Sequence, residues 1–192
     1  MIISFKNINS GFSLFEILIS ITIGAMLLGL VLSIYTLTMR SVSSSEKHSE
    51  LTANSRIIIE RLARDIRQAR QIATPLPTIP TDPQLAPPSQ LEMLDGHDTT
   101  LVRYVRYYLA NTDLKRQIRE YYFPSDPSIL VTFNAVDDFG NPASLRLIED
   151  QLVGQYVKQL SFYGQNLITI ELGLEKDSAT HQTIASFYGR NL

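Results

Sequence analysis

The sequence predicts an α+β fold in which a long N-terminal helix packs on an antiparallel β-sheet head domain. Residues 17–39 carry no charge, and the apolar residues between 51 and 73 recur at helical spacing. After residue 89, short runs rich in apolar and β-branched residues are separated by turn residues. A chain of 192 residues has room for one membrane segment and one modest domain.

The composition excludes several classes of site. The net charge is −2, so no global field attracts nucleic acid or anionic lipid, and any such site has to be a local patch. The chain has no cysteine, which excludes disulfides, thiolate metal sites and cysteine nucleophiles. The core of the head must therefore be stabilised by packing alone.

Residues 12–39 are predicted to form a membrane-spanning helix. The uncharged stretch 17–39 would extend about 34 Å as a helix, enough to cross a bilayer core. A signal peptide has a shorter apolar region followed by a small-residue cleavage site, which is not evident here. Lys6 and the N-terminal amine precede the span, so the positive-inside rule places the N-terminus in the cytoplasm and residues after Arg40 outside.

Glu16 is the unusual residue at the start of this helix. A carboxylate inside hydrocarbon costs roughly 2–3 kcal/mol or more. It could simply reach the headgroup region at the membrane edge. A second interpretation comes from the residues before it, because a polar, basic leader ends in Gly11, and Phe12-Ser13-Leu14-Phe15 leads into Glu16.

This segment resembles the type IV prepilin processing motif. The resemblance implies that a prepilin peptidase removes residues 1–11 by cleavage between Gly11 and Phe12, and that the new Phe12 amine is methylated. It also implies that Glu16 pairs with the free amine of a neighbouring subunit in the filament. The implied partners are other pilins or pseudopilins and the filament assembly platform. The expected location is the inner membrane as a single-pass protein, and then a pilus or pseudopilus.

Small residues inside the span favour close helix packing. Ser20/Gly24 and Ala25/Gly29 are pairs spaced by four, which let helix backbones approach in lipid. The alternative is that such residues are merely tolerated in membrane helices. The helix has no proline near Ser33, which favours a minor subunit or pseudopilin within the family resembled.

Residues 40–73 are expected to continue the helix as an amphipathic segment that Pro75 ends. Its five arginines between 56 and 70 suggest a solvated face with cations near the helix C-terminus rather than a nucleic-acid helix. Residues 74–88 hold six of the nine prolines and are predicted to be an extended linker.

Residues 89–192 are predicted to be the strand-rich globular head. Turns are expected at 95–96, 110–113 and 137–142, where Asp, Gly, Asn and Pro gather. The segment 167–174 alternates most clearly between apolar and polar residues. The expected strands are 90–94, 101–109, 114–123, 129–136, 157–163, 167–174 and 183–188, in one sheet against the helix.

A second, narrower resemblance concerns the whole chain. The helix sequence ERLARDIRQA, a hairpin containing LKR and a terminus near Arg190-Asn191 are similar to larger minor subunits of this family. These are the PilW- or PpdB-type minor pilins and the J-type pseudopilin of type II secretion. The resemblance implies a pilin-like fold and a structural role in a pilus or secretion-type filament.

No pattern typical of an enzyme or a cofactor site is found. The three histidines are dispersed and no zinc, phosphate-loop or nucleophile-elbow motif occurs, so we expect neither catalysis nor a cofactor. A weak calcium alternative is Asp137, Asp138 and Asn141, although these residues also suit a plain turn.

One hairpin raises the possibility of DNA contact, as in a DNA-uptake pilin. Cations interleaved with tyrosines can bind a single nucleic-acid strand, but cross-strand Tyr packing with charged residues at the rim is the commoner use, so nucleic acid is not an expected partner. A further alternative is a permanently anchored extracytoplasmic binding domain. The cations are Arg103, Arg106, Lys115, Arg116 and Arg119.

Overall fold

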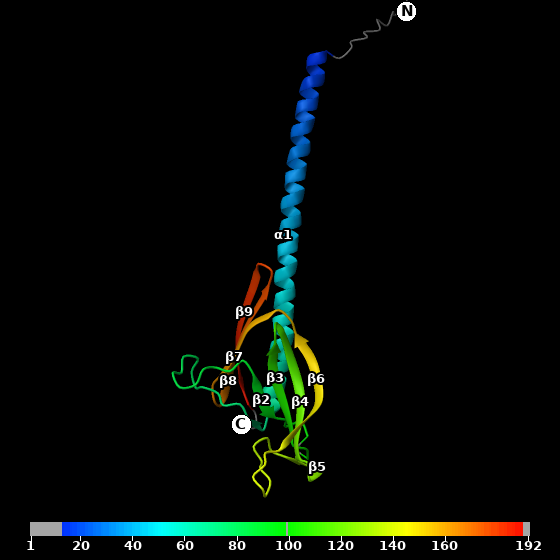
Figure 1. The fold of residues 1–192 in the computed structure, drawn as a ribbon. Helices are drawn as coiled ribbons and strands as arrows, with labels where there is room; N and C mark the ends of the chain where they lie inside the picture. Colours follow the sequence, from blue (N-terminus) through cyan, green and yellow to red (C-terminus); the bar gives the residue numbers. More distant parts are fainter. Residues whose placement is uncertain (1–12, 99, 190–192) are drawn as a thin grey trace, which may run out of the picture. The chain divides into compact units, whose positions relative to one another are not determined.

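The computed structural model describes residues 13–98 and 100–189. Two compact units make up the chain, residues 1–45 and residues 46–192. The helix α1 runs from Leu14 to Gln68 and contributes to both units (Figure 1). The predicted α+β class, a long apolar N-terminal helix followed by antiparallel sheets, is confirmed.

The helix ends five residues earlier than the amphipathic pattern predicts. Instead of continuing to residue 73, the backbone turns after Gln68, and Arg70 donates its N–H to the carbonyl of Leu94 at 3.0 Å. The next residues form β1, Gln71–Ile72, which pairs with Met93 and Leu94. The helix ends here because of a tertiary contact: the edge of the strand 91–94 provides the backbone hydrogen bonds that a further helical turn would have made.

The first sheet is built around β4, Asp113–Phe123. β3 (Arg103–Ala110) pairs with β4 up to Glu120, and β5 (Asp126–Val131) pairs with the same edge from Tyr121 onward. β6, Ser144–Gly154, pairs with the opposite edge of β4. β2, Leu91–Leu94, lies beside β3 and carries β1 at the sheet margin.

The expected β3–β4 hairpin is present, with Ala110 opposite Asp113. Its tight turn places Asn111 at a φ of 59°, a left-handed conformation that Asn tolerates better than most residues. The connection 73–90 contains no helix or strand, as the proline content suggests.

The second sheet contains β7 (Val157–Tyr163), β8 (Leu167–Lys176) and β9 (Ala179–Tyr188) in that order. The alternation in β8 is confirmed, because its four even-numbered apolar residues from Ile168 to Leu174 are at most 2% exposed. Two ion pairs, Lys47–Asp177 at 2.7 Å and Glu50–Lys176 at 2.6 Å, tie the β8–β9 turn to α1.

Three strand expectations are wrong. The head has two sheets rather than one, β5 begins and ends earlier than 129–136, and β9 starts at Ala179 rather than at residue 183. The strand β6 is not among the expected strands at all. Its pairing with β4 has register irregularities at two places, which break the alternation that would mark it in the sequence.

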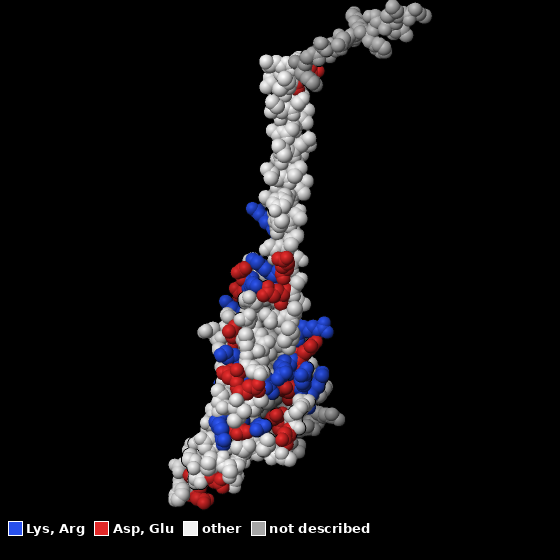
Figure 2. Space-filling view, turned by 90° about the vertical axis from the view of Figure 1, so that its right-hand side faces the viewer, with Lys and Arg blue, Asp and Glu red and all other residues white. Residues whose placement is uncertain are grey.

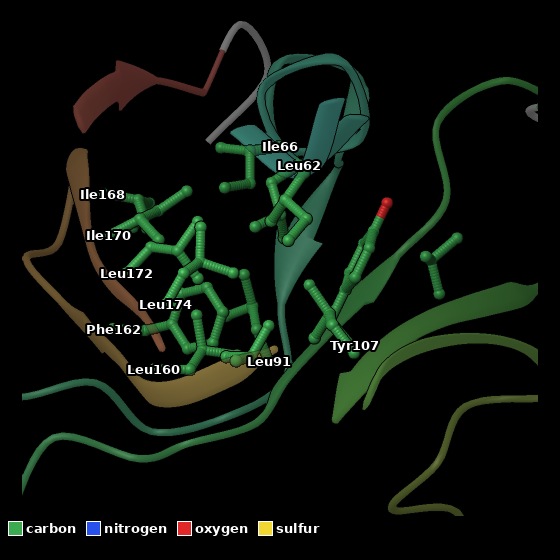
Figure 3. Packing of buried hydrophobic residues seen from close by; sticks show 14 of the residues in the cluster. Leu62, Ile66, Leu91, Tyr107, Leu160, Phe162, Ile168, Ile170, Leu172 and Leu174 are labelled. Atoms are coloured by element: carbon green, nitrogen blue, oxygen red, sulfur yellow. The ribbon is translucent and has the colours of Figure 1, made fainter. Parts of the chain in front are cut away.

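The core of residues 46–192 lies between α1 and the two sheets. The predicted helix stripe is confirmed from Leu51 to Ile66, where its main apolar residues are 0% exposed. Figure 3 shows Leu62 and Ile66 facing the apolar side chains of β7 and β8, with Tyr107 of β3 at the margin of the cluster. Burial of this kind contributes about 25 cal/mol per Å² of apolar area.

Candidate functional site

The first described residues form a capping arrangement at the start of α1. The Ser13 hydroxyl accepts a hydrogen bond from the Glu16 N–H at 3.2 Å, and the Glu16 carboxylate accepts one from the Ser13 N–H at 3.0 Å. This reciprocal pair is a capping box, which satisfies two of the orphan donors of a helix N-terminus. Gly11 and Phe12, the predicted cleavage and methylation positions, lie outside the described residues.

The capping box holds the Glu16 carboxylate at the very beginning of the helix. There the positive end of the helix dipole favours a negative charge. Only one carboxylate oxygen, Oε2, takes part in the hydrogen bond with Ser13. Since a carboxylate has about four acceptor positions, Glu16 retains capacity to bind a cation.

Beyond Glu16 the helix presents an apolar surface. One helix of the described chain is long and apolar enough to cross a membrane, and no residue of its most apolar window is buried. The surface of this segment is uncharged in Figure 2. Every Ser and Thr hydroxyl between residues 17 and 39 donates to a carbonyl of its own helix: Ser20, Thr22, Ser33, Thr36 and Thr38.

The predicted packing residues lie on this exposed surface. A Cβ added at Gly24 or Gly29 would meet no atom within 4 Å. A spacing of four places Ser20 beside Gly24, and Ala25 beside Gly29, on one face of the helix. Both glycine positions are therefore accessible to a neighbouring helix, and helix packing at these positions stays a prediction.

The five cations of the β3–β4 hairpin are divided between two faces of the sheet. Arg103 and Arg116 lie on the face toward α1 and pair with Glu120 and Asp65, each at 2.7 Å. Both guanidinium groups are therefore committed to carboxylates inside the head.

The other three cations, Arg106, Lys115 and Arg119, lie on the opposite face. There Arg119 is 3.5 Å from Glu92, and Arg106 lies over the Tyr108 ring at 5.2 Å. Tyr121 also donates to Glu92, at 2.8 Å. This face interleaves acids with cations, so the geometry favours cross-strand packing over a phosphate-binding groove, and DNA contact stays an untested alternative.

The segment proposed as a weak calcium alternative forms a turn. The carboxylate of Asp137 accepts hydrogen bonds from the backbone N–H groups of Phe139 and Asn141 and from the Asn141 side-chain amide. These bonds, led by the one from the Asn141 side chain, lower the pKa of Asp137. Asp138, the third candidate ligand, lines the same shallow depression beside the turn. Within the described residues, no group of three His, Cys, Asp or Glu side chains could hold a metal ion.

A buried polar cluster was not foreseen from the sequence. Tyr107, which is 0% exposed, donates its hydroxyl to Asp65 at 2.8 Å, beside the Asp65–Arg116 pair. One sequence feature could have indicated a buried carboxylate: Asp65 lies three residues after Leu62, at the margin of the apolar stripe of α1. Its partner on β4 is 51 residues away, and only the fold brings the two together.

Comparison with known proteins locates a family feature at the N-terminus. Residues 6–32 match the prokaryotic N-terminal methylation motif. No curated protein matches this chain. The matched span contains the predicted cleavage position, Phe12, Glu16 and the first part of the apolar helix. The motif and the single apolar helix together support a type IV pilin-like protein of the kind that is processed at its N-terminus and anchored by one membrane span.

Proposed function

We propose that this chain is a structural minor subunit, a minor pilin or pseudopilin, of a type IV pilus or a type II secretion-like filament. A prepilin peptidase removes residues 1–11, the Phe12 amine is methylated, and the mature chain joins the filament through residues 12–39. The observation that carries the proposal is Glu16, capped by Ser13 at the start of an exposed apolar helix within the methylation motif.

Assembly follows from the electrostatics of the helix start. An unpaired carboxylate or charged amine costs roughly 2–3 kcal/mol or more when it lies inside the hydrocarbon of a membrane. When subunits pack side by side, the amine of one Phe12 neutralises the Glu16 of its neighbour, and the paired charges cost less than the separate ones. Peptide-bond cleavage is what generates that amine, so assembly depends on processing.

The proposed location follows from the same residues. In the precursor, Lys6 and the N-terminus lie in the cytoplasm, the helix spans the inner membrane, and residues 46–192 are outside. The absence of proline from the helix segment 14–68 supports a minor subunit, and the narrower proposal is a PilW- or PpdB-type minor pilin or a J-type pseudopilin. The protein does no chemistry of its own in this role.

Intact-mass measurement of the protein extracted from its native membrane tests the proposal. The expected species begins at Phe12 and carries one added methyl group. A strain without prepilin peptidase is the control, and it should yield only the chain beginning at Met1. Recovery of Met1 on all the material from the normal strain would support the rival role, a permanently anchored extracytoplasmic domain, and would overturn the proposal.

A further inference from the structure

Two long strands end the sheets of the head without a neighbour on their outer edge. Among residues 13–98 and 100–189, no strand pairs with the edge of β6 that faces away from β4, or with the edge of β9 that faces away from β8. β6 has 11 residues and β9 has 10. Natural proteins usually protect such edges, because unpaired N–H and C=O groups recruit another strand.

The two free edges run in opposite directions. β6 passes from Gln151, opposite Arg116, to Gly154, which lies against Ile58, so it runs against the direction of α1. β9 follows α1, since Thr183 bonds to Ser55 at 2.7 Å and Phe187 lies under Arg67. Figure 1 shows the two strands on opposite sides of this part of α1. Heads in the same orientation can therefore pair β6 with β9 in the antiparallel sense.

The side chains on both strands suit such a pair. On β6, four large apolar residues are about half exposed, which is unusual for a solvent-facing strand. On β9, Ile184 is 68% and Tyr188 is 70% exposed, on the face away from α1. Leu145, Leu147 and Leu152 lie on the corresponding face of β6, whereas Ile148 lies at a register irregularity. Antiparallel pairing would bring the two apolar rows together as cross-strand neighbours. The β6 residues are Leu145, Leu147, Ile148 and Leu152.

A groove beside β9 fits the other face of an added strand. It has a volume of about 780 Å³ and lies between the end of β9 and α1. Ile59, Ala63 and Phe187 give it apolar walls, and Arg64 and Arg67 contribute positive charge. On β6, Glu149 lies on the helix-facing side, 3.7 Å from Arg116. In an added β6 strand, the same side would carry Glu149 toward these arginines.

We propose that β6 of one molecule pairs with β9 of a second copy of this chain, extending one sheet into the next. The inference rests on the membrane anchoring of the proposed function, which holds all copies in one orientation. A symmetric β6–β6 pair would instead require two heads in opposite orientations. Residue 46 would then lie at opposite ends of the pair, which two copies anchored in the same membrane cannot adopt. The β6–β9 contact is heterologous, so it continues from copy to copy.

Crosslinking in the native membrane tests this contact, because the chain has no cysteine of its own. Leu152→Cys and Ile184→Cys replace exposed side chains, so the fold should tolerate both. The two positions come opposite each other when Glu149 of the added strand lies beside Phe187, near Arg64 and Arg67. With a short bis-maleimide, the full-length chain carrying both substitutions should give dimers, trimers and longer ladders. Each single variant alone should remain monomeric, and a mixture of the two should give dimers only.

A second variant places a positive charge on the free edge of β6. Leu147→Lys, added to the chain that carries Leu152→Cys and Ile184→Cys, should reduce the ladder by about tenfold, because a lysine blocks edge pairing. Ile79→Lys is the matched control, since Ile79 is 52% exposed but lies in the proline-rich connection, and the ladder should persist.

Three results would overturn the inference: dimers from Leu152→Cys alone, crosslinks only to a different protein, or no crosslink in any variant. The N-terminal mass of the crosslinked chains separates this outcome from the proposed function. Ladders formed by chains that still begin at Met1 would leave the strand pairing standing and would count against the processed filament subunit.

Discussion

Asp65 of α1 and Arg116 of β4 form an ion pair with 2.7 Å between Oδ2 and Nε, and their side chains are only 9% and 10% exposed. The Tyr107 hydroxyl donates to the same carboxylate oxygen at 2.8 Å. One carboxylate thus joins the helix to two strands of the first sheet. Because all three groups are buried, loss of one partner leaves the others without compensation.

Asp65→Ala should destabilise the head by about 3–5 kcal/mol, because it leaves the Arg116 charge buried without a counter-ion. The measurement is denaturant unfolding of the full-length chain in detergent micelles, followed by near-UV circular dichroism of the tyrosines. The double variant Asp65→Leu with Arg116→Met should recover much of the loss, since an apolar pair of similar volume needs no counter-charge.

Arg56→Ala is the matched control for this pair. Arg56 also bonds a carboxylate, Glu60, at 2.8 Å, but the two side chains are 80% and 60% exposed. Such a surface pair contributes about 0–1 kcal/mol. Equal losses for Asp65→Ala and Arg56→Ala would contradict the stabilising role of the buried pair.

Tyr107 should make the head sensitive to alkali. Burial first, and then the charge of Asp65, raise the pKa of the Tyr107 phenol above its ordinary value of about 10. A group whose pKa is raised by folding contributes stability that is complete below its unfolded pKa and is lost as pH rises above it. Unfolding midpoints measured at increasing pH should therefore fall above about pH 10.

Tyr107→Phe should flatten this alkaline fall, although the variant loses about 1 kcal/mol at neutral pH with the hydrogen bond to Asp65. Part of the slope should persist, because burial also raises the pKa of Tyr104 and Tyr121. Tyr188→Phe is the control, since this side chain is 70% exposed. An unchanged slope in Tyr107→Phe would remove the proposed source of the alkaline sensitivity.

Two glycines should differ in their tolerance of alanine. A Cβ at Gly96 would collide with the backbone carbonyl of Gln68, whereas one at Gly154 would collide with the side chain of Ile58. Overpacking costs about 1–3 kcal/mol when side chains can shift, and more when backbone must move. Thermal unfolding should show Gly96→Ala as the more harmful change.

In an Ile58→Ala background, Gly154→Ala should cost less stability than it does in the parent chain, because both Ile58 atoms in the way of the added Cβ, Cγ1 and Cδ1, are removed. The same substitution should not help Gly96→Ala, whose obstacle is the end of α1. Rescue of both glycine variants, or of neither, would contradict this description of the two contacts.

Glu16→Ala should leave leader cleavage and methylation intact and should impair assembly. Without the carboxylate, the Phe12 amine of a neighbour lacks its partner at a cost of about 2–3 kcal/mol, roughly a thirtyfold loss or more. The measurements are the N-terminal mass of the membrane form and the fraction of the subunit recovered in sheared filaments. Ser20→Ala is the control, and incorporation of Glu16→Ala at the normal level would count against this role of Glu16.

The elements predicted correctly from the sequence are those set by local pattern. The apolar anchor, the helix stripe from Leu51 to Ile66 and the alternation in β8 each follow from the spacing of neighbouring residues. The end of α1 and the strand β6 were not predictable in this way. Hydrogen bonds to β2 decide the first, and pairing irregularities with β4 hide the second.

The division of the hairpin cations between two faces of the sheet could have been predicted from the sequence. Arg103 and Arg106 are three residues apart in one strand, and an odd spacing places them on opposite faces. The alternation of side chains along a strand is therefore enough to divide the positive charges between the two faces of the sheet. The commitment of Arg116 to Asp65 was beyond sequence reasoning, because its partner belongs to a different element.

The serine and threonine side chains of the anchor have a further consequence. Since each of their hydroxyls already donates within the helix, no neighbouring chain is required to shelter them from hydrocarbon. In the proposed role, the chain could therefore remain in the bilayer as a solitary helix, and the time of its assembly would be set by events at the membrane surface rather than by the membrane span.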